Sequence, residues 1–167
     1  VGRGCPYKCT YCSNHAMEEL AEGQYVRYRS SEDMISEIEY LTRQYPLMRH
    51  IYLEIETVGA DIVKGIDLFE KLAEYNNARK EKLSFRINLA LHSNFVRIEE
   101  KYRKFLELCQ KANVTALNVG LESGSYRVRR EILRRPRYTN EELVGFCRTA
   151  REYGVATSLL VLMGVPG

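Results

Sequence analysis

The sequence has 167 residues, of which 45% are hydrophobic and 28% are charged, and its formal net charge is +3. This composition supports one domain with a buried core and excludes a disordered polyelectrolyte, while the small net charge excludes a strongly basic nucleic-acid binder. No apolar run approaches the roughly 18 residues of a membrane span, and the first residues lack the apolar core of a signal peptide. We therefore expect one domain over residues 1–167 of a cytoplasmic protein.

Hydrophobic periodicity alternates along the chain between the spacing of helices and that of strands. A first helix is expected to begin at Ser31, as its N-cap, and to end at Tyr45. The elements expected after it are a strand at 51–55, a helix at 62–80, a strand at 83–91, a helix at 99–112, a strand at 114–121, helices at 125–134 and 140–153, and a strand at 155–163. Strands separated by helix-length connections imply parallel pairing, so the sequence predicts a repeated βα unit.

Three of these strands alternate between apolar and polar residues, as Ile51, Leu53 and Ile55 do with their neighbours. Because successive side chains point to opposite faces, one face of the sheet is apolar and must be covered by the helices. At roughly 31 residues per unit, about five units fit, which predicts an α/β fold that is a partial TIM-like (βα) barrel. Its polar face would line a substrate cavity with Arg86, Asn88, His92 and Asn118. A flat sheet with one solvated face is the alternative.

Three of the five cysteines fall within eight residues, at C-x3-C-x2-C spacing: Cys5, Cys9 and Cys12. Three thiolates on one short loop can hold three corners of an iron-sulfur cube and leave the fourth iron without a protein ligand. The alternative is a zinc site with His15 as the fourth ligand. Cys109 and Cys147 lie alone in helical patterns, where free cysteine is an ordinary buried residue.

This loop, with Tyr11 directly before its last cysteine, resembles the signature of the radical S-adenosylmethionine (radical SAM) superfamily. The resemblance covers residues 1–167 as a radical SAM core domain. It implies that the three cysteines hold a 4Fe-4S cluster. It also implies that S-adenosylmethionine binds at the open iron and is cleaved reductively to a 5′-deoxyadenosyl radical.

The resemblance also implies residue roles toward the cofactor. Tyr11 would approach the adenine, and Glu122, in a family-like segment that includes Ser123, would contact the ribose. Arg134 would contact the cofactor carboxylate, and Gly164 belongs to a turn beside the adenine. These residue types suit the roles, since a carboxylate accepts from two hydroxyls and a guanidinium matches a carboxylate.

The sequence departs from the family at the end of the second strand, where many members carry Gly-Gly-Glu to bind the amino group of the cofactor. Here the stretch is Leu53-Glu54-Ile55-Glu56-Thr57. Both Glu54 and Glu56 lie on the polar face, so either carboxylate could accept from the ammonium. The sequence leaves this choice open.

The closest resemblance within the family is to the cobalamin-binding branch and the methylthiotransferases. It implies a reductant such as flavodoxin or ferredoxin, and cobalamin, where used, on a domain absent from this chain. We expect the core of a larger protein, which binds cluster and cofactor for methylation, cyclisation or methylthiolation but does not turn over substrate alone. The alternative is a non-catalytic metal or iron-sulfur module that binds nucleic acid through the arginines between Arg127 and Arg137.

Overall fold

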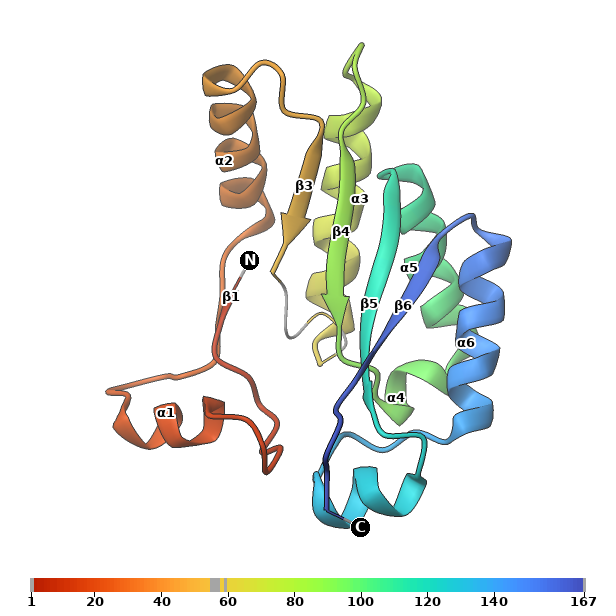
Figure 1. Cartoon of the computed structure of the whole chain (residues 1–167). Coiled ribbons are helices and arrows are strands. Elements are labelled where there is room, and N and C mark those ends of the chain that lie inside the picture. The colour runs from red at the N-terminus through yellow and green to blue at the C-terminus, as the bar shows by residue number, and fades with distance from the viewer. Residues whose placement is uncertain (1, 55–57, 59, 167) are drawn as a thin grey trace.

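A computed structural model describes residues 2–54, 58 and 60–166 (Figure 1). Within these residues the main sheet has four parallel strands, which neighbour one another in chain order: β3 (His50–Leu53), β4 (Ser84–Leu89), β5 (Val114–Glu122) and β6 (Ala156–Val161). The long helices alternate with the strands: α2 (Ser31–Gln44), α3 (Ile62–Asn77), α5 (Glu99–Lys111) and α6 (Asn140–Glu152). This is the βα repeat that the sequence predicts, with boundaries that differ by only a few residues.

Smaller elements complete the described fold: β1 (Gly2–Arg3), α1 (Asn14–Leu20), β2 (Arg27–Tyr28), α4 (Ser93–Val96) and the π-helix η1 (Val128–Ile132). Strand β1 pairs antiparallel with β2 and lies outside the main sheet. Its two residues are too few to continue the parallel ladder beside β3. The parallel sheet therefore contains four strands, against the about five units expected. Throughout the described residues, each helix is too short or too polar to cross a bilayer.

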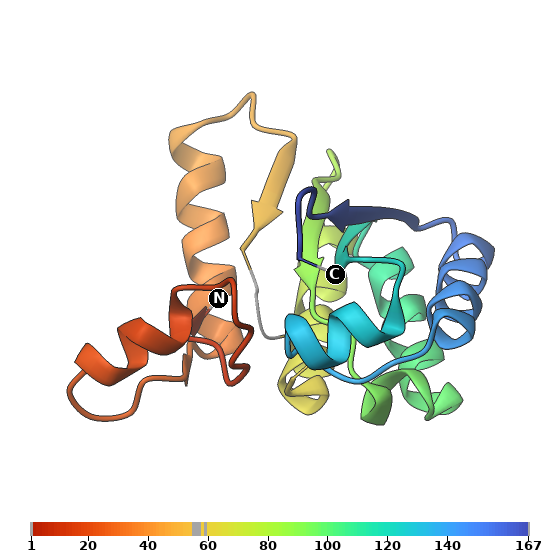
Figure 2. The same ribbon diagram turned by 60° about the horizontal axis from the view of Figure 1, so that its bottom comes forward.

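The alternation of the strands is confirmed by their burial. On β4, Phe85, Ile87 and Leu89 are buried, whereas Arg86 is exposed and Asn88 is half-buried. The buried face packs against the layer of α3, α5 and α6, which lies on one side of the sheet in both views (Figure 1, Figure 2). The opposite face keeps its polar side chains, and the register pairs them across strands, because Asn88 lies beside Asn118. One face of the sheet is thus a core and the other is available for a site.

The N-cap of helix α2 lies one residue earlier than the sequence predicts. The Ser30 hydroxyl oxygen accepts from the backbone N–H of Asp33 at 3.1 Å and caps the helix. Ser31 was the expected N-cap, but its hydroxyl donates instead to the carboxylate of Asp67 on α3. Two adjacent serines offer equivalent caps in sequence, and the contact with α3 decides between them.

A buried amide ties α3 to the sheet at the end remote from the cysteines. The Asn76 side chain donates to the carbonyls of Leu83 (2.9 Å) and Ala112 (3.0 Å). Its Oδ1 accepts from the backbone N–H of Leu83 at 2.8 Å. Because Asn76 is 1% exposed, no water replaces these partners. The side chain fixes where β4 starts relative to the ends of α3 and α5.

We expect Asn76→Ala to lower the free energy of unfolding by about 2 kcal/mol, because it removes the acceptor of the buried Leu83 N–H and the Asn76 donor to the Ala112 carbonyl. Asn77→Ala, on the exposed neighbouring position, is the matched control and should change stability by less than about 0.5 kcal/mol. Urea denaturation followed by circular dichroism measures both. Equal losses in the two variants would contradict the role assigned to the amide.

Candidate functional site

The three clustered cysteines line one cavity of about 210 Å³ beside the carboxyl ends of β4 and β5. All three are free thiols. The same cavity is lined by Tyr11, Asn88, Asn118, Glu122 and Arg135. The structure therefore brings together the predicted ligands Cys5, Cys9 and Cys12 with two predicted cofactor contacts, Tyr11 and Glu122. Parallel α/β sheets place ligands at this end of their strands.

The cysteine loop is held in place by two close contacts with distant parts of the chain. Thr10 donates from its backbone N–H to the Leu133 carbonyl (3.1 Å) and from its hydroxyl to the Ile132 carbonyl (2.7 Å). On the other side, Gly4 has a φ of +78°, and a Cβ there would lie 2.5 Å from the Tyr25 carbonyl oxygen. The loop is thus fitted between the Tyr25 region and η1, and Figure 2 shows it beside that segment.

Arg135 is the charged group that joins this loop to the end of β5. Its Nη1 donates to the Tyr11 hydroxyl at 3.2 Å and lies 3.9 Å from the Cys9 Sγ. Its Nη2 donates to the Gly120 carbonyl at 2.5 Å, and Nη1 lies 3.8 Å from the Glu122 Oε1. The Arg135 Nε is buried without a hydrogen-bond partner. Arg135 lines the cavity, where a guanidinium can donate to a ligand oxygen.

The sequence assigns this role to Arg134, which the structure does not bring to the cavity. Arg134 is exposed and has a φ of +51°. The intervening turn is a π-helix, closed by a bond from the Leu133 N–H to the Val128 carbonyl at 2.9 Å. A π-turn inserts one residue relative to an α-helix, and this shifts which of the two adjacent arginines reaches the cavity. The sequence analysis did not single out Arg135, which lines the cavity.

Glu122 ends β5 with its carboxylate buried at the cavity. Its backbone φ is +62°, a conformation that is uncommon outside glycine and that clusters at functional sites. Two residues earlier, a Cβ on Gly120 would lie 2.6 Å from both the Arg135 Nη2 and the Glu122 Oε1. Only glycine leaves room there for the two charged groups, which therefore lie side by side over the strand.

Burial shapes the protonation of the groups around the thiols. It raises the pKa of the Cys9 thiol, although the Arg135 charge acts in the opposite direction. It also raises the pKa of Tyr7 to about 12 and raises the pKa of Tyr11, again against the effect of Arg135. Both phenols are therefore neutral hydrogen-bond donors at pH 7.

A row of polar side chains crosses the sheet next to the cavity. Asn118 Nδ2 donates to the Tyr52 hydroxyl (3.1 Å) and to Asn88 Oδ1 (3.2 Å), and the Tyr52 hydroxyl donates to the same Asn88 oxygen. Asn88 Nδ2 donates to Glu54 Oε2 at 2.8 Å. Glu54 itself lines a neighbouring cavity with Arg3, Asn14 and Tyr25. Glu56, the other candidate for the amino group, lies outside the described residues.

The remaining predicted residues lie around the cavity without lining it. The Ser123 Oγ accepts from the Ser125 N–H at 3.2 Å, and Gly164 is exposed with a φ of +77°. His92 stacks on Tyr7 with ring centroids 6.2 Å apart. His15 is absent from the cavity lining, and nowhere in the described ranges do three or more His, Cys, Asp or Glu side chains form a site for a single metal ion.

The buried guanidinium of Arg129 fixes the segment between β5 and α6 that carries Arg135. Arg129 is 1% exposed, and it donates to the carbonyls of Ser123 (2.7 Å) and Tyr138 (3.3 Å) and to Asn140 Oδ1 (2.8 Å). Its guanidinium lies 5.0 Å from the Tyr138 ring centroid. Its backbone carbonyl accepts from the Arg135 N–H at 2.8 Å. Arg129 therefore clamps the end of β5 to the start of α6 and sets the position of Arg135.

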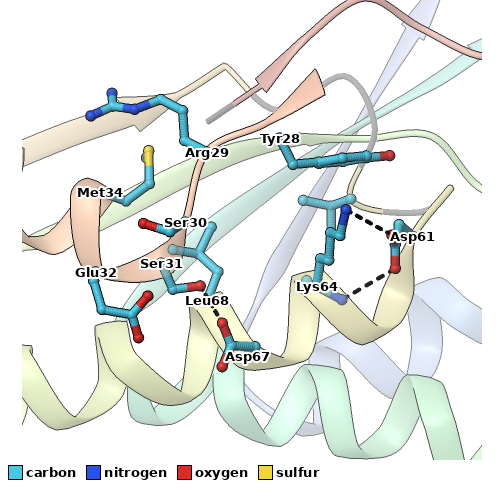
Figure 3. A pocket seen from close by; sticks show the side chains of 12 residues that line it. Tyr28, Arg29, Ser30, Ser31, Glu32, Met34, Asp61, Lys64, Asp67 and Leu68 are labelled. Atoms are coloured by element: carbon cyan, nitrogen blue, oxygen red, sulfur yellow. Dashed lines mark hydrogen bonds and ion pairs between the residues drawn. The ribbon is translucent and has the colours of Figure 1, made fainter. Parts of the chain in front are cut away.

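A larger cavity, of about 380 Å³, lies between β2 and the amino-terminal ends of α2 and α3 (Figure 3). The Lys64 ammonium lies there over the Tyr28 ring, 4.2 Å from its centroid, and 3.7 Å from the Asp61 carboxylate. No cysteine lines this cavity, and its cations already have partners within the chain. The smaller cavity at the thiols is therefore the candidate site.

The chain is similar to known proteins in both sequence and fold. A family model described as the radical SAM superfamily matches residues 1–167. Three similar solved structures are of the cobalamin-dependent S-adenosylmethionine radical enzyme OxsB: with aqua-cobalamin bound (22% identity, TM-score 0.70), with aqua-cobalamin and S-adenosylmethionine bound (21%, 0.68), and apo with selenomethionine (23%, 0.69). Each likeness covers 97% of this chain and 23% of the OxsB chain, so this chain spans under a quarter of their length. The likeness confirms the expected α/β fold. No curated protein matches the sequence.

We expect Arg129→Met to lower the free energy of unfolding by about 2–4 kcal/mol, because a side chain of similar length leaves two buried carbonyls and an amide without a donor. Arg130→Met, at the half-buried next position, should cost less than about 0.5 kcal/mol. Thermal and urea unfolding report the difference. If the two variants prove equally stable, Arg129 is not the clamp.

Proposed function

The chain belongs to the radical SAM superfamily, and from that membership we propose that it is the core of an enzyme that binds an iron-sulfur cluster and S-adenosylmethionine. The observation that carries the proposal is the single cavity in which three thiols meet Glu122 and Arg135. The fold alone would not support this function, because one fold hosts many activities. The residues at the cavity supply the specific argument.

The donor set fits a 4Fe-4S cluster with one open iron. Three cysteine thiolates on one loop supply three of its four ligands, and no fourth Cys or His lines the cavity among the described residues. Such a cluster spans several metal positions, so it does not require the thiols to converge on one ion. Cys5, Cys9 and Cys12 would hold it, in keeping with their sequence spacing.

The other side of the cavity fits the cofactor. The Arg135 guanidinium, which lines the cavity, would donate to the cofactor carboxylate in place of Arg134. Glu122 would accept from the ribose, and Tyr11 would lie against the adenine. Glu54 would accept from the amino group across the adjoining cavity.

Together the bound cluster and cofactor supply one-electron reductive cleavage of the cofactor sulfonium. The residues of this chain would bind the cluster and the cofactor and would orient the cofactor. Arg135, fixed by Gly120 and Arg129, would hold the cofactor carboxylate at a set position. The neutral Tyr11 phenol stays a hydrogen-bond donor at pH 7. The buried apolar face behind β4 and β5 keeps the site rigid.

The polar row of Tyr52, Asn88 and Asn118 would face the substrate. Its groups are uncharged donors and acceptors that already bond to one another, so they suit a polar neutral substrate group. We also propose that cobalamin, which two of the OxsB structures contain, is carried by a domain outside this chain and that substrate turnover needs such additional parts. Methylation, cyclisation and methylthiolation are the candidate reactions.

The cluster assignment is tested by the iron content of protein reconstituted without oxygen. Cys9→Ala removes a thiol at the cavity and should reduce iron from about four per chain to less than about one. Cys109→Ala removes a thiol on the buried face of α5, with 0% exposure, and should leave the iron content unchanged. One tightly held zinc in the unmodified protein would contradict the assignment.

The cofactor assignment is tested by comparing two adjacent arginines. Arg135→Gln should weaken S-adenosylmethionine binding about 10- to 100-fold, because charge-assisted hydrogen bonds contribute about 1.5–3 kcal/mol. Arg134→Gln, on an exposed position, should change the affinity less than about twofold. Calorimetric titration of the reconstituted proteins gives both affinities, with iron content as the control. The reverse order of effects would restore the role that the sequence gives to Arg134.

A further inference from the structure

The arginines of one short segment divide into two groups with different surroundings. Residues 126–138 contain six arginines and one glutamate, a formal charge of +5, which exceeds the +3 of the whole chain. Arg129 and Arg135 are turned inward and hydrogen-bonded. The other four make up what we call the arginine surface, in which Arg130 is half-buried and the rest are exposed: Arg127, Arg130, Arg134 and Arg137.

Most of the charge on this surface is not neutralised by the chain. Arg127 lies 3.9 Å from Glu131, whereas Arg130, Arg134 and Arg137 form no ion pair with any described residue. Exposed arginines without an ion pair among the described residues also occur on other elements, as at Arg86 and Arg148, but here three unpaired arginines lie within eight residues of one segment. A cluster of unpaired cations keeps a positive potential that attracts an acidic partner.

The arginine surface adjoins the cysteine loop. Thr10, between Cys9 and Cys12, bonds to the carbonyls of Ile132 and Leu133, which lie between the exposed arginines in sequence. Figures 1 and 2 both show the loop beside this segment. A partner bound on the arginine surface would thus lie next to the group held by the thiols.

We propose that the arginine surface docks a small acidic one-electron carrier protein, which reduces the cluster held by Cys5, Cys9 and Cys12. The inference rests on the proposed function. In this step one electron leaves the reduced flavin or iron-sulfur group of the carrier, which is oxidised, and enters the cluster, which is reduced. No covalent bond forms or breaks, and no proton is required.

The observations favour a redox carrier over a nucleic acid. Electron-transfer encounters use small, weakly bound interfaces that are steered by charge, which matches four arginines on one short segment. Single-stranded nucleic acids instead need a long basic track with stacked aromatics. Of the two tyrosines in the segment, Tyr138 is buried and Tyr126 is 48% exposed. Electron transfer requires the carrier to bind close to the group held by the thiols, and the arginine surface meets that requirement.

The test is the rate of cluster reduction in anaerobic stopped-flow, with a reduced flavodoxin as the acidic carrier and dithionite as the small reductant. Arg130→Glu/Arg137→Glu reverses two charges and leaves Arg134 and Arg135 in place. At low ionic strength the flavodoxin rate should fall at least about 10-fold, because steering by charge is lost. The dithionite rate and the iron content should stay within about twofold of the unmodified protein.

Arg148→Glu/Arg151→Glu is the matched control, since both arginines are exposed on α6 and have no ion pair among the described residues. It makes the same change in net charge, and the flavodoxin rate should change less than about twofold. In the unmodified protein this rate should fall steeply with added salt, as screening predicts.

Three results would overturn the proposal: an unchanged flavodoxin rate in the Arg130/Arg137 variant, an equal loss in the Arg148/Arg151 control, or loss of single-stranded RNA binding with reduction intact. The last result would identify a nucleic-acid surface. Failure of the proposed function itself has a different signature, namely that the unmodified protein assembles no cluster or that dithionite fails to reduce it.

Discussion

The site depends on one buried guanidinium that joins two parts of the chain far apart in sequence. Arg135 contacts Tyr11 in the cysteine loop and Gly120 on β5, and it lies beside Glu122. Its charge is compensated by that carboxylate and by a carbonyl, so burial is tolerated. Without it, the thiols and the strand end would be two unrelated features. With it, they form the walls of a single cavity.

The two faces of the sheet have different roles because side chains alternate between them along each strand. Apolar residues such as Phe85 on β4 and Leu117 on β5 pack under the helices. The residues that alternate with them along each strand point to the other face and form the polar row. A four-stranded parallel sheet with helices on one side leaves its other face free for binding. The same alternation that stabilises the fold therefore supplies the groups beside the site.

Much of this architecture was predictable from the sequence, since strand and helix periodicities are strong signals over five residues or more. The sequence gives no such signal for α1, which buries none of its residues, and it could not choose between Ser30 and Ser31 as a cap. Which of Arg134 and Arg135 lines the cavity depends on a π-turn whose extra residue has no periodic signature. Such positions are set by contacts between distant segments, which a local pattern does not contain.

The bonds that seat the cysteine loop span most of the chain, because Thr10 and Ile132 are 122 residues apart and Tyr11 and Arg135 are 124 apart. Closing such a loop has an entropic cost that local βα contacts avoid, so non-local pairings form late in folding. The sheet and its helices would consequently assemble before the thiol loop docks. The cluster that we propose for these thiols would then be inserted late in maturation, after the sheet and its helices have folded.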